Sequence, residues 1–190
     1  MLLLHTIIKN FKSSFSEIKS VHILTTCAIL LALRVILGML EINIGNTFRI
    51  SFSYLPIAIG GFLFGPIASC FIAFLGDVIT LIVHPTGFPN FGIMFAQVLS
   101  GFIYGILLYK QSISLIRTSI TCLTITIFCH LIITSISLNI AYNIPYEIMM
   151  PARLISNSIL LPINIIGLYV SQKTLSKIKI PILNGRILKR

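Results

Sequence analysis

The stretch "ISFSYLPIAIGGFLFGPIASCFIAFLGDVITLIV", residues 50–83, consists of two apolar segments separated by a glycine and a proline. Gly65 and Pro66 interrupt the apolar run at "FGP", because proline lacks the N–H that a helix interior requires. The first segment, 50–64, is short. The second, 67–83, approaches the roughly 20 residues that a helix needs to cross a bilayer. The pattern predicts two membrane helices joined by a tight turn.

The rest of the chain has the same character. It contains 190 residues, of which 56% are hydrophobic and 9% are charged, and its mean hydropathy is +1.02. A soluble domain carries about 25% charged residues, so this composition excludes one. Further apolar segments lie at 22–40, 91–109, 119–138 and 151–170. We therefore expect an all-α integral membrane protein, a compact bundle of six transmembrane helices over residues 21–172.

The basic residues gather in three places and account for most of the net charge of +10. They precede the first segment, flank the loop between Lys110 and Arg117, and follow the last segment. By the positive-inside rule these places are cytoplasmic, and so are both termini. Residues 1–20 are expected to be a cytoplasmic segment, either an amphipathic helix on the membrane surface or a polar tail, and 173–190 a basic tail. Attraction to anionic lipid headgroups explains the charge without a nucleic-acid partner.

No motif indicates catalysis, a metal site or a cofactor. The four cysteines lie within apolar runs without metal-ligand spacing and are interpreted as small buried hydrophobic residues. There is no glycine-rich phosphate loop, and only four residues are acidic. The chain is expected to be a binding subunit that another protein powers, not an enzyme.

Polar residues inside the predicted helices are the candidates for function, because a charge in the membrane costs free energy. Arg34 and Asp77 are expected to pair with each other. Pro151 is predicted to begin the sixth helix in its first turn, where a missing N–H costs nothing. Pro162 is predicted to kink that helix or to free a backbone carbonyl.

Arg153 and Asn157 lie one turn apart on the sixth predicted helix, and Asn164 returns to nearly the same face. A guanidinium suits a carboxylate, and an amide can bind the edge of a heterocycle. Arg49 adds a second positive charge at the same end of the bundle. The alternatives are that Arg153 extends to the headgroups and that the asparagines bond neighbouring helices. His130 either contacts a ligand or bonds a neighbouring helix.

Several motifs together resemble one family, the S components of bacterial energy-coupling factor (ECF) transporters, and within it the folate-specific branch. The resemblance covers residues 25–171 and rests on "ALRVILG" (32–38), "GNTFRISFSYLPIAIGGFLFGPIA" (45–68), "LGDVITLIVHPTG" (75–87), "SGFIYGILLYK" (100–110) and "MPARLISNSILLPIN" (150–164).

This resemblance implies a six-helix protein of the bacterial cell membrane that binds a vitamin at its outer face, under the loops 41–50, 84–90 and 139–150. It also implies association with a transmembrane coupling protein and two cytoplasmic ATPases. Ala28 and Ala32 match the family's small-residue pair that contacts the coupling protein. An S component for another vitamin or a pterin-like compound is the alternative, followed by a membrane-embedded enzyme or assembly factor.

The resemblance also implies a set of residues for folate. Arginines would neutralise its carboxylates, phenylalanines would pack on its rings, and amides would bind the pterin. The expected substrate-binding residues are Arg49, Thr86, Gly87, Phe88, Phe91, Gln97, His130, Arg153 and Asn157. The outer loop at 84–90 and the residues after it depart from the folate pattern, since residues 87–97 read "GFPNFGIMFAQ" with Asn90 in place of a glycine, and the chain has no tryptophan.

Overall fold

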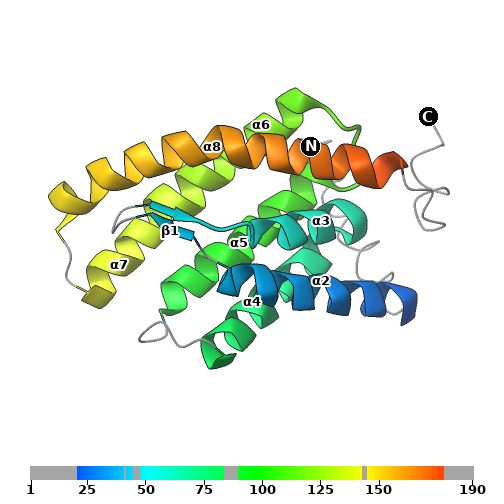
Figure 1. The fold of residues 1–190 in the computed structure, drawn as a ribbon, viewed down its shortest axis with the longest axis horizontal. Helices are drawn as coiled ribbons and strands as arrows, with labels where there is room; N and C mark the ends of the chain where they lie inside the picture. Colours follow the sequence, from blue (N-terminus) through cyan, green and yellow to red (C-terminus); the bar gives the residue numbers. More distant parts are fainter. Residues whose placement is uncertain (1–20, 41, 45–47, 84–89, 143–144, 178–190) are drawn as a thin grey trace, which may run out of the picture.

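The structure is a computed structural model that describes residues 21–40, 42–44, 48–83, 90–142 and 145–177. These form helices and one short hairpin (Figure 1). In chain order the elements are α2 (Val21–Met39), β1 (Ile42–Ile44), β2 (Phe48–Ile50), α3 (Tyr54–Phe64), α4 (Pro66–Val83), α5 (Phe91–Leu108), α6 (Leu115–Ile125), η1 (Thr126–Ile133), α7 (Thr134–Tyr142) and α8 (Tyr146–Lys177). The predicted N-terminal segment 1–20 lies outside the described residues.

The predicted turn at "FGP" is confirmed. Gly65 has φ 89°, which favours glycine over residues with a Cβ. Its N–H donates to the Gly61 carbonyl at 3.1 Å, and α4 begins at the next residue, Pro66. Proline is well placed there because the first residues of a helix have no intrahelical acceptor for an N–H.

The hairpin corrects the start of the second predicted segment. Helix was expected from Ile50, but Ile50 lies in β2, opposite Ile42 of β1, and α3 begins at Tyr54. Strand pairing satisfies backbone groups beside the membrane just as a helix would, so apolar composition alone did not distinguish the two. The other elements of the described residues are all helices, as predicted, and short non-helical connections lie at 51–53 and 109–114.

The last helix begins earlier than predicted. α8 runs over 32 residues from Tyr146, with Glu147 in its first turn and both Pro151 and Pro162 inside it. The Met149 N–H donates to the Pro145 carbonyl, so the helix starts after Pro145. The placement of Pro151 in the first turn is therefore wrong, because a different proline precedes the helix. α8 continues through Pro162 and into the predicted basic tail as far as Lys177.

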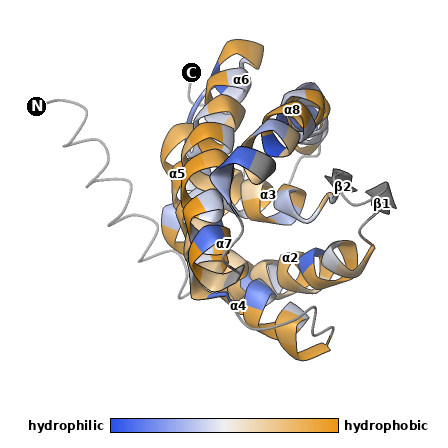
Figure 2. Cartoon of the chain, turned by 90° about the vertical axis from the view of Figure 1, so that its left-hand side faces the viewer, coloured by the Kyte–Doolittle hydropathy of each residue, from blue (hydrophilic) through white to orange (hydrophobic). Residues whose placement is uncertain are grey.

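Among the described residues, five helical stretches are long and apolar enough to cross a membrane: Val21–Met39, Pro66–Val83, Phe91–Leu108, Leu115–Ala141 and Met149–Lys177. α3, with 11 residues, is about 16 Å long and does not span alone. Hydrophobic residues predominate along the helices (Figure 2), and many of the large ones are exposed. Ile29, Ile82 and Ile140, for example, are 68%, 74% and 75% exposed. Such a surface requires lipid around it.

The start of α2 and the end of α8 lie at one end of the bundle, while the hairpin and the α7–α8 junction lie at the other (Figure 1). We call the latter the hairpin end.

Glycines allow α3, α4 and α5 to pack closely. A Cβ at position 61 would lie 2.9 Å from the Gly105 nitrogen, and one at position 101 would lie 2.9 Å from the Ser69 carbonyl oxygen. A Cβ at position 105 would overlap the backbone of Pro66. The Ser69 hydroxyl donates to the Ile57 carbonyl at 2.8 Å across the same contact. Small residues and interhelical hydrogen bonds of this kind stabilise helix pairs in lipid.

The predicted pair between α2 and α4 is confirmed. Arg34 Nη2 donates to Asp77 Oδ1 at 2.6 Å, and the Arg34 side chain is 4% exposed. A Cβ at position 76 would overlap the guanidinium, so Gly76 provides the space for it. Arg34 Nε and Asp77 Oδ2 are buried without another hydrogen-bond partner. The pair therefore depends on one short, charge-assisted contact.

Asp77→Ala should destabilise the protein by about 3–5 kcal/mol, because it leaves the buried Arg34 charge without its partner. A thermal unfolding measurement on the protein in detergent would show a lower midpoint. The double variant Arg34→Met/Asp77→Leu should recover most of the loss, since it buries neither charge. A wild-type midpoint for Asp77→Ala would contradict the importance of the pair.

Gly105→Ala should cost about 1–3 kcal/mol, because its methyl group meets the Pro66 backbone rather than a flexible side chain. Gly38→Ala is the matched control, since its Cβ would lie 3.7 Å from Thr80 in ordinary contact. Both variants are measured by thermal unfolding. Equal unfolding midpoints for the two variants would show that α4 and α5 can move apart without loss of stability.

Candidate functional site

A cavity of about 590 Å³ lies between α3, α5, α8 and the continuous rod formed by α6, η1 and α7. This volume is within the range of roughly 300–1,000 Å³ typical of small-molecule sites. The lining begins near the hairpin end, with Ser51, Ile93, Leu138 and Met149. Along α8 it continues to Asn164, about 22 Å further into the bundle.

Four residues predicted from the sequence line this cavity together. Gln97 comes from α5, His130 from η1, and Arg153 and Asn157 from α8. Asn164, which was expected near the same face of that helix, also lines the cavity. The structure therefore brings side chains from three separate segments to one space.

Arg153 points into the bundle, toward η1 and α7. Its Nη1 donates to the His130 carbonyl oxygen at 2.8 Å and to Ser135 Oγ at 3.2 Å. Asn157 Nδ2 donates to the Arg153 carbonyl at 2.9 Å, a bond within its own helix. The structure thus favours an inward-facing arginine over one that extends to the headgroups.

The wall that holds Arg153 has an unusual backbone. η1 is a π-helix of eight residues between α6 and α7, and Thr134 donates from Oγ1 to the Cys129 carbonyl, five residues back, at 2.8 Å. π-Helical turns are rare and frequently mark functional sites. Here the π-helical segment supplies both the His130 side chain that lines the cavity and the His130 carbonyl that accepts from Arg153.

The remaining predicted binding residues do not join this lining. Phe91 is the first residue of α5 and is 78% exposed. Arg49 lies in β2 opposite Asn43, and the structure describes only its backbone. Thr86, Gly87 and Phe88 lie outside the described residues. Ala28 and Ala32 are exposed on α2, which contributes nothing to the described lining.

Sequence reasoning missed several hydroxyl groups of the lining. On α5, Ile93, Gln97, Ser100 and Tyr104 follow one another at intervals of four, three and four residues, so they share one helical face. That spacing is a signal which could have identified Ser100 and Tyr104. Ser51, Ser53, Tyr54, Thr126 and Ser156 complete the missed set of hydroxyl-bearing residues. Of the residues that line the cavity in the described part of the chain, none is acidic.

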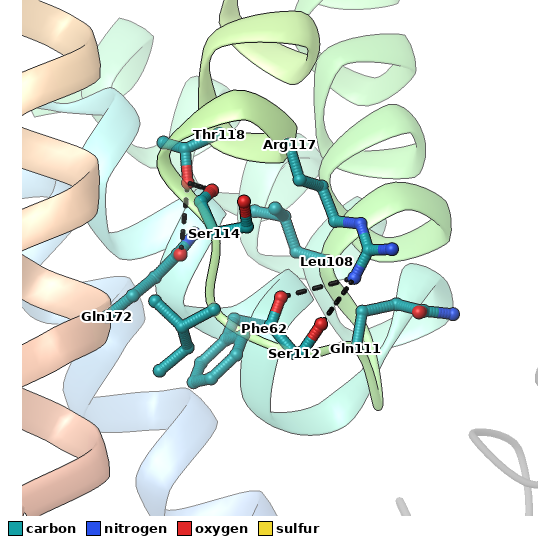
Figure 3. A pocket seen from close by; sticks show the side chains of 9 residues that line it. Phe62, Leu108, Gln111, Ser112, Ser114, Arg117, Thr118 and Gln172 are labelled. Carbon is teal, nitrogen blue, oxygen red and sulfur yellow. Dashed lines mark hydrogen bonds between the residues drawn. The ribbon is translucent and has the colours of Figure 1, made fainter.

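A second depression, near Gln111 and Arg117, encloses essentially no free volume. Hydrogen bonds hold it closed, from Thr118 Oγ1 to Gln172 Oε1 at 3.3 Å and from Arg117 Nη1 to the Ser112 carbonyl at 3.1 Å (Figure 3). It is therefore not a site for a ligand of the size that the larger cavity admits.

Comparison with known proteins identifies the family to which the chain belongs. Residues 22–183 match the family described as the ECF transporter, substrate-specific component. The chain belongs to this family. Its members bind the substrate of a membrane transporter and are not enzymes, so the chain is a membrane-embedded S component.

Two relatives and one solved structure extend the comparison. The folate transporter FolT of Clostridium novyi is 25% identical over 164 residues, which cover 85% of this chain and 94% of that protein. An uncharacterized protein of Mycoplasma genitalium is 32% identical over 102 residues, or 51% of this chain and 35% of that protein. A crystal structure of FolT bound with folic acid superimposes with a TM-score of 0.70 at 26% identity, covering 79% of this chain and 92% of that one.

Proposed function

We propose that this S component captures folate from outside the cell and delivers it through a transmembrane coupling protein and two cytoplasmic ATPases. The observation that carries the proposal is the position of Arg153. This cation lines the outer part of the cavity, and neutral hydrogen-bonding groups line the part near Asn164. The names of the FolT relative and of the folate-bound neighbour support the choice of ligand.

The cavity has the chemistry of a ligand with one anionic end and one polar ring. Arg153 lies 11 residues before Asn164 on α8, which corresponds to about 16 Å along the helix. Near Asn164 are Tyr54, whose hydroxyl donates to the Asn164 carbonyl at 3.4 Å, and Tyr104. We infer that a glutamate carboxylate of folate binds Arg153 and that the pterin lies deeper, among these uncharged groups.

The orientation in the membrane follows from the charges. Arg117, Lys173 and Lys177 lie toward the end of the bundle at which α2 starts and α8 ends. The positive-inside rule makes that end cytoplasmic, together with both termini. The hairpin end, where the cavity begins, then faces outward, as an uptake protein requires.

A different vitamin or a pterin-like compound is the second candidate. It is favoured by the end of the outer loop 84–90 and the start of α5. Phe91 is 78% exposed instead of lining the cavity, and Asn90 stands where the resemblance to folate members gives a glycine. Both candidates use the same cavity, so a ligand titration separates them.

Isothermal titration calorimetry should show one folate bound per chain, and Arg153→Ala should weaken binding by about 30-fold or more, since it removes a charged partner from a buried carboxylate. A pterin without carboxylates should bind both proteins equally. Arg117→Ala, which removes an arginine that bonds Ser112 outside the cavity, is the control. Failure of the wild-type protein to bind folate, with another vitamin binding, would reassign the cargo.

Ala28→Trp/Ala32→Trp should prevent co-purification with the coupling protein while folate affinity stays within about twofold, because both alanines are exposed on α2, away from the cavity. Ser158→Trp, at an exposed position of α8, is the matched control and should co-purify normally. Retention of the complex by the double variant would place the coupling surface elsewhere.

A further inference from the structure

Asn90 connects the first turn of α5 to α7. Its Oδ1 accepts from the N–H groups of Gly92 and Ile93, at 3.1 and 3.4 Å, and so caps the helix. The same oxygen accepts from the Ser137 hydroxyl, and Asn90 Nδ2 donates to the Ser137 carbonyl at 3.3 Å. One side chain therefore holds both its own helix and a residue 47 positions away in sequence.

Gly92 allows the two helices to meet at this point. A Cβ at position 92 would overlap the Cβ and hydroxyl of Ser137, so the backbone of α5 lies directly against that side chain. The contact thus combines close packing with reciprocal hydrogen bonds, which define a single separation between α5 and α7 more strictly than apolar packing does.

The neighbours of these residues line the cavity. Ile93 follows Gly92 on α5, and Leu138 follows Ser137 on α7. Both belong to the part of the lining nearest the hairpin end. Any change in the distance between Gly92 and Ser137 must move Ile93 relative to Leu138, because each pair is joined by one peptide bond.

We propose that Asn90 and Ser137 are positioning residues of the binding site, which set the separation of α5 and α7 beside Ile93 and Leu138 and thereby the rate at which a bound ligand leaves. The proposal rests on the proposed function for its ligand. Neither residue touches the ligand in this account, since neither lines the cavity. Asn90 and Ser137 instead affect the shape of the cavity.

Ser137→Ala tests this directly, because it removes the hydroxyl while Asn90 can still cap α5. Release of radiolabelled folate, chased with unlabelled folate, should become about tenfold faster, with the association rate within about twofold of wild type. Asn90→Gly should behave similarly. Asn90→Asp keeps the accepting oxygen but loses the Nδ2 donor to the Ser137 carbonyl, so it should also release folate faster than wild type. Ser119→Ala, which removes an exposed hydroxyl bonded to its own helix at Leu115, is the control.

Amide hydrogen exchange of the ligand-free protein provides a readout that needs no ligand. Residues 91–96 should exchange about fivefold faster in Ser137→Ala and unchanged in Ser119→Ala. An unchanged unfolding midpoint alongside the faster release would separate positioning from general destabilisation.

The outcomes distinguish the two proposals. Wild-type protein that binds folate, with Ser137→Ala releasing it at the wild-type rate, would overturn the positioning role. If the wild-type protein does not bind folate, the proposed cargo fails. The exchange data then decide alone, since unchanged exchange at residues 91–96 overturns the positioning role and faster exchange supports it.

Discussion

The hydrocarbon core of a membrane offers no hydrogen-bond partner, and the rest of this structure depends on that constraint. Every long segment in the described part of the chain is helical, so its backbone bonds are internal. Even where η1 departs from α-helix, the chain remains a continuous helical rod from Leu115 to Tyr142. Hydroxyls inside the helices follow the same rule. Thr80, Thr121 and Ser171 each donate to the carbonyl four residues earlier, at 2.7–2.8 Å.

The same constraint removes the hydrophobic drive between helices, because lipid is as apolar as the side chains. Association then requires close contact and polar bonds, which explains the glycines at positions 61, 101 and 105 and the Arg34–Asp77 pair. Those contacts hold α2, α3, α4 and α5 together without using the polar groups of α8. Arg153, Asn157 and Asn164 remain available to line a cavity, and that division of roles makes a binding site inside an apolar bundle possible.

Sequence patterns correctly predicted the features that follow from the composition of a segment or from the spacing of its residues. The apolar segments, the turn at Gly65 and Pro66 and the Arg34–Asp77 pair follow from such patterns. The grouping of Gln97, His130, Arg153 and Asn157 was instead implied by the family resemblance. The hairpin was missed because strands of three residues leave no alternation to detect. η1 was missed because a shift from four-residue to five-residue bonding leaves the apolar pattern intact. The start of α8 was misplaced because Pro145 and Pro151 carry the same local signal.

Arg153 shows how the parts act together. Its side chain is half-buried, and its guanidinium donates to two neutral acceptors, the His130 carbonyl and the Ser135 hydroxyl. These contacts orient the guanidinium in advance, so the carboxylate that we propose as its ligand would bind at a lower cost of ordering. His130 and Ser135 precede Ser137 on the same rod, and Ser137 is bonded to Asn90 at the start of α5. Residues 130–137 therefore connect Arg153, the proposed partner of a ligand carboxylate, to the Asn90–Ser137 contact that we propose shapes the cavity.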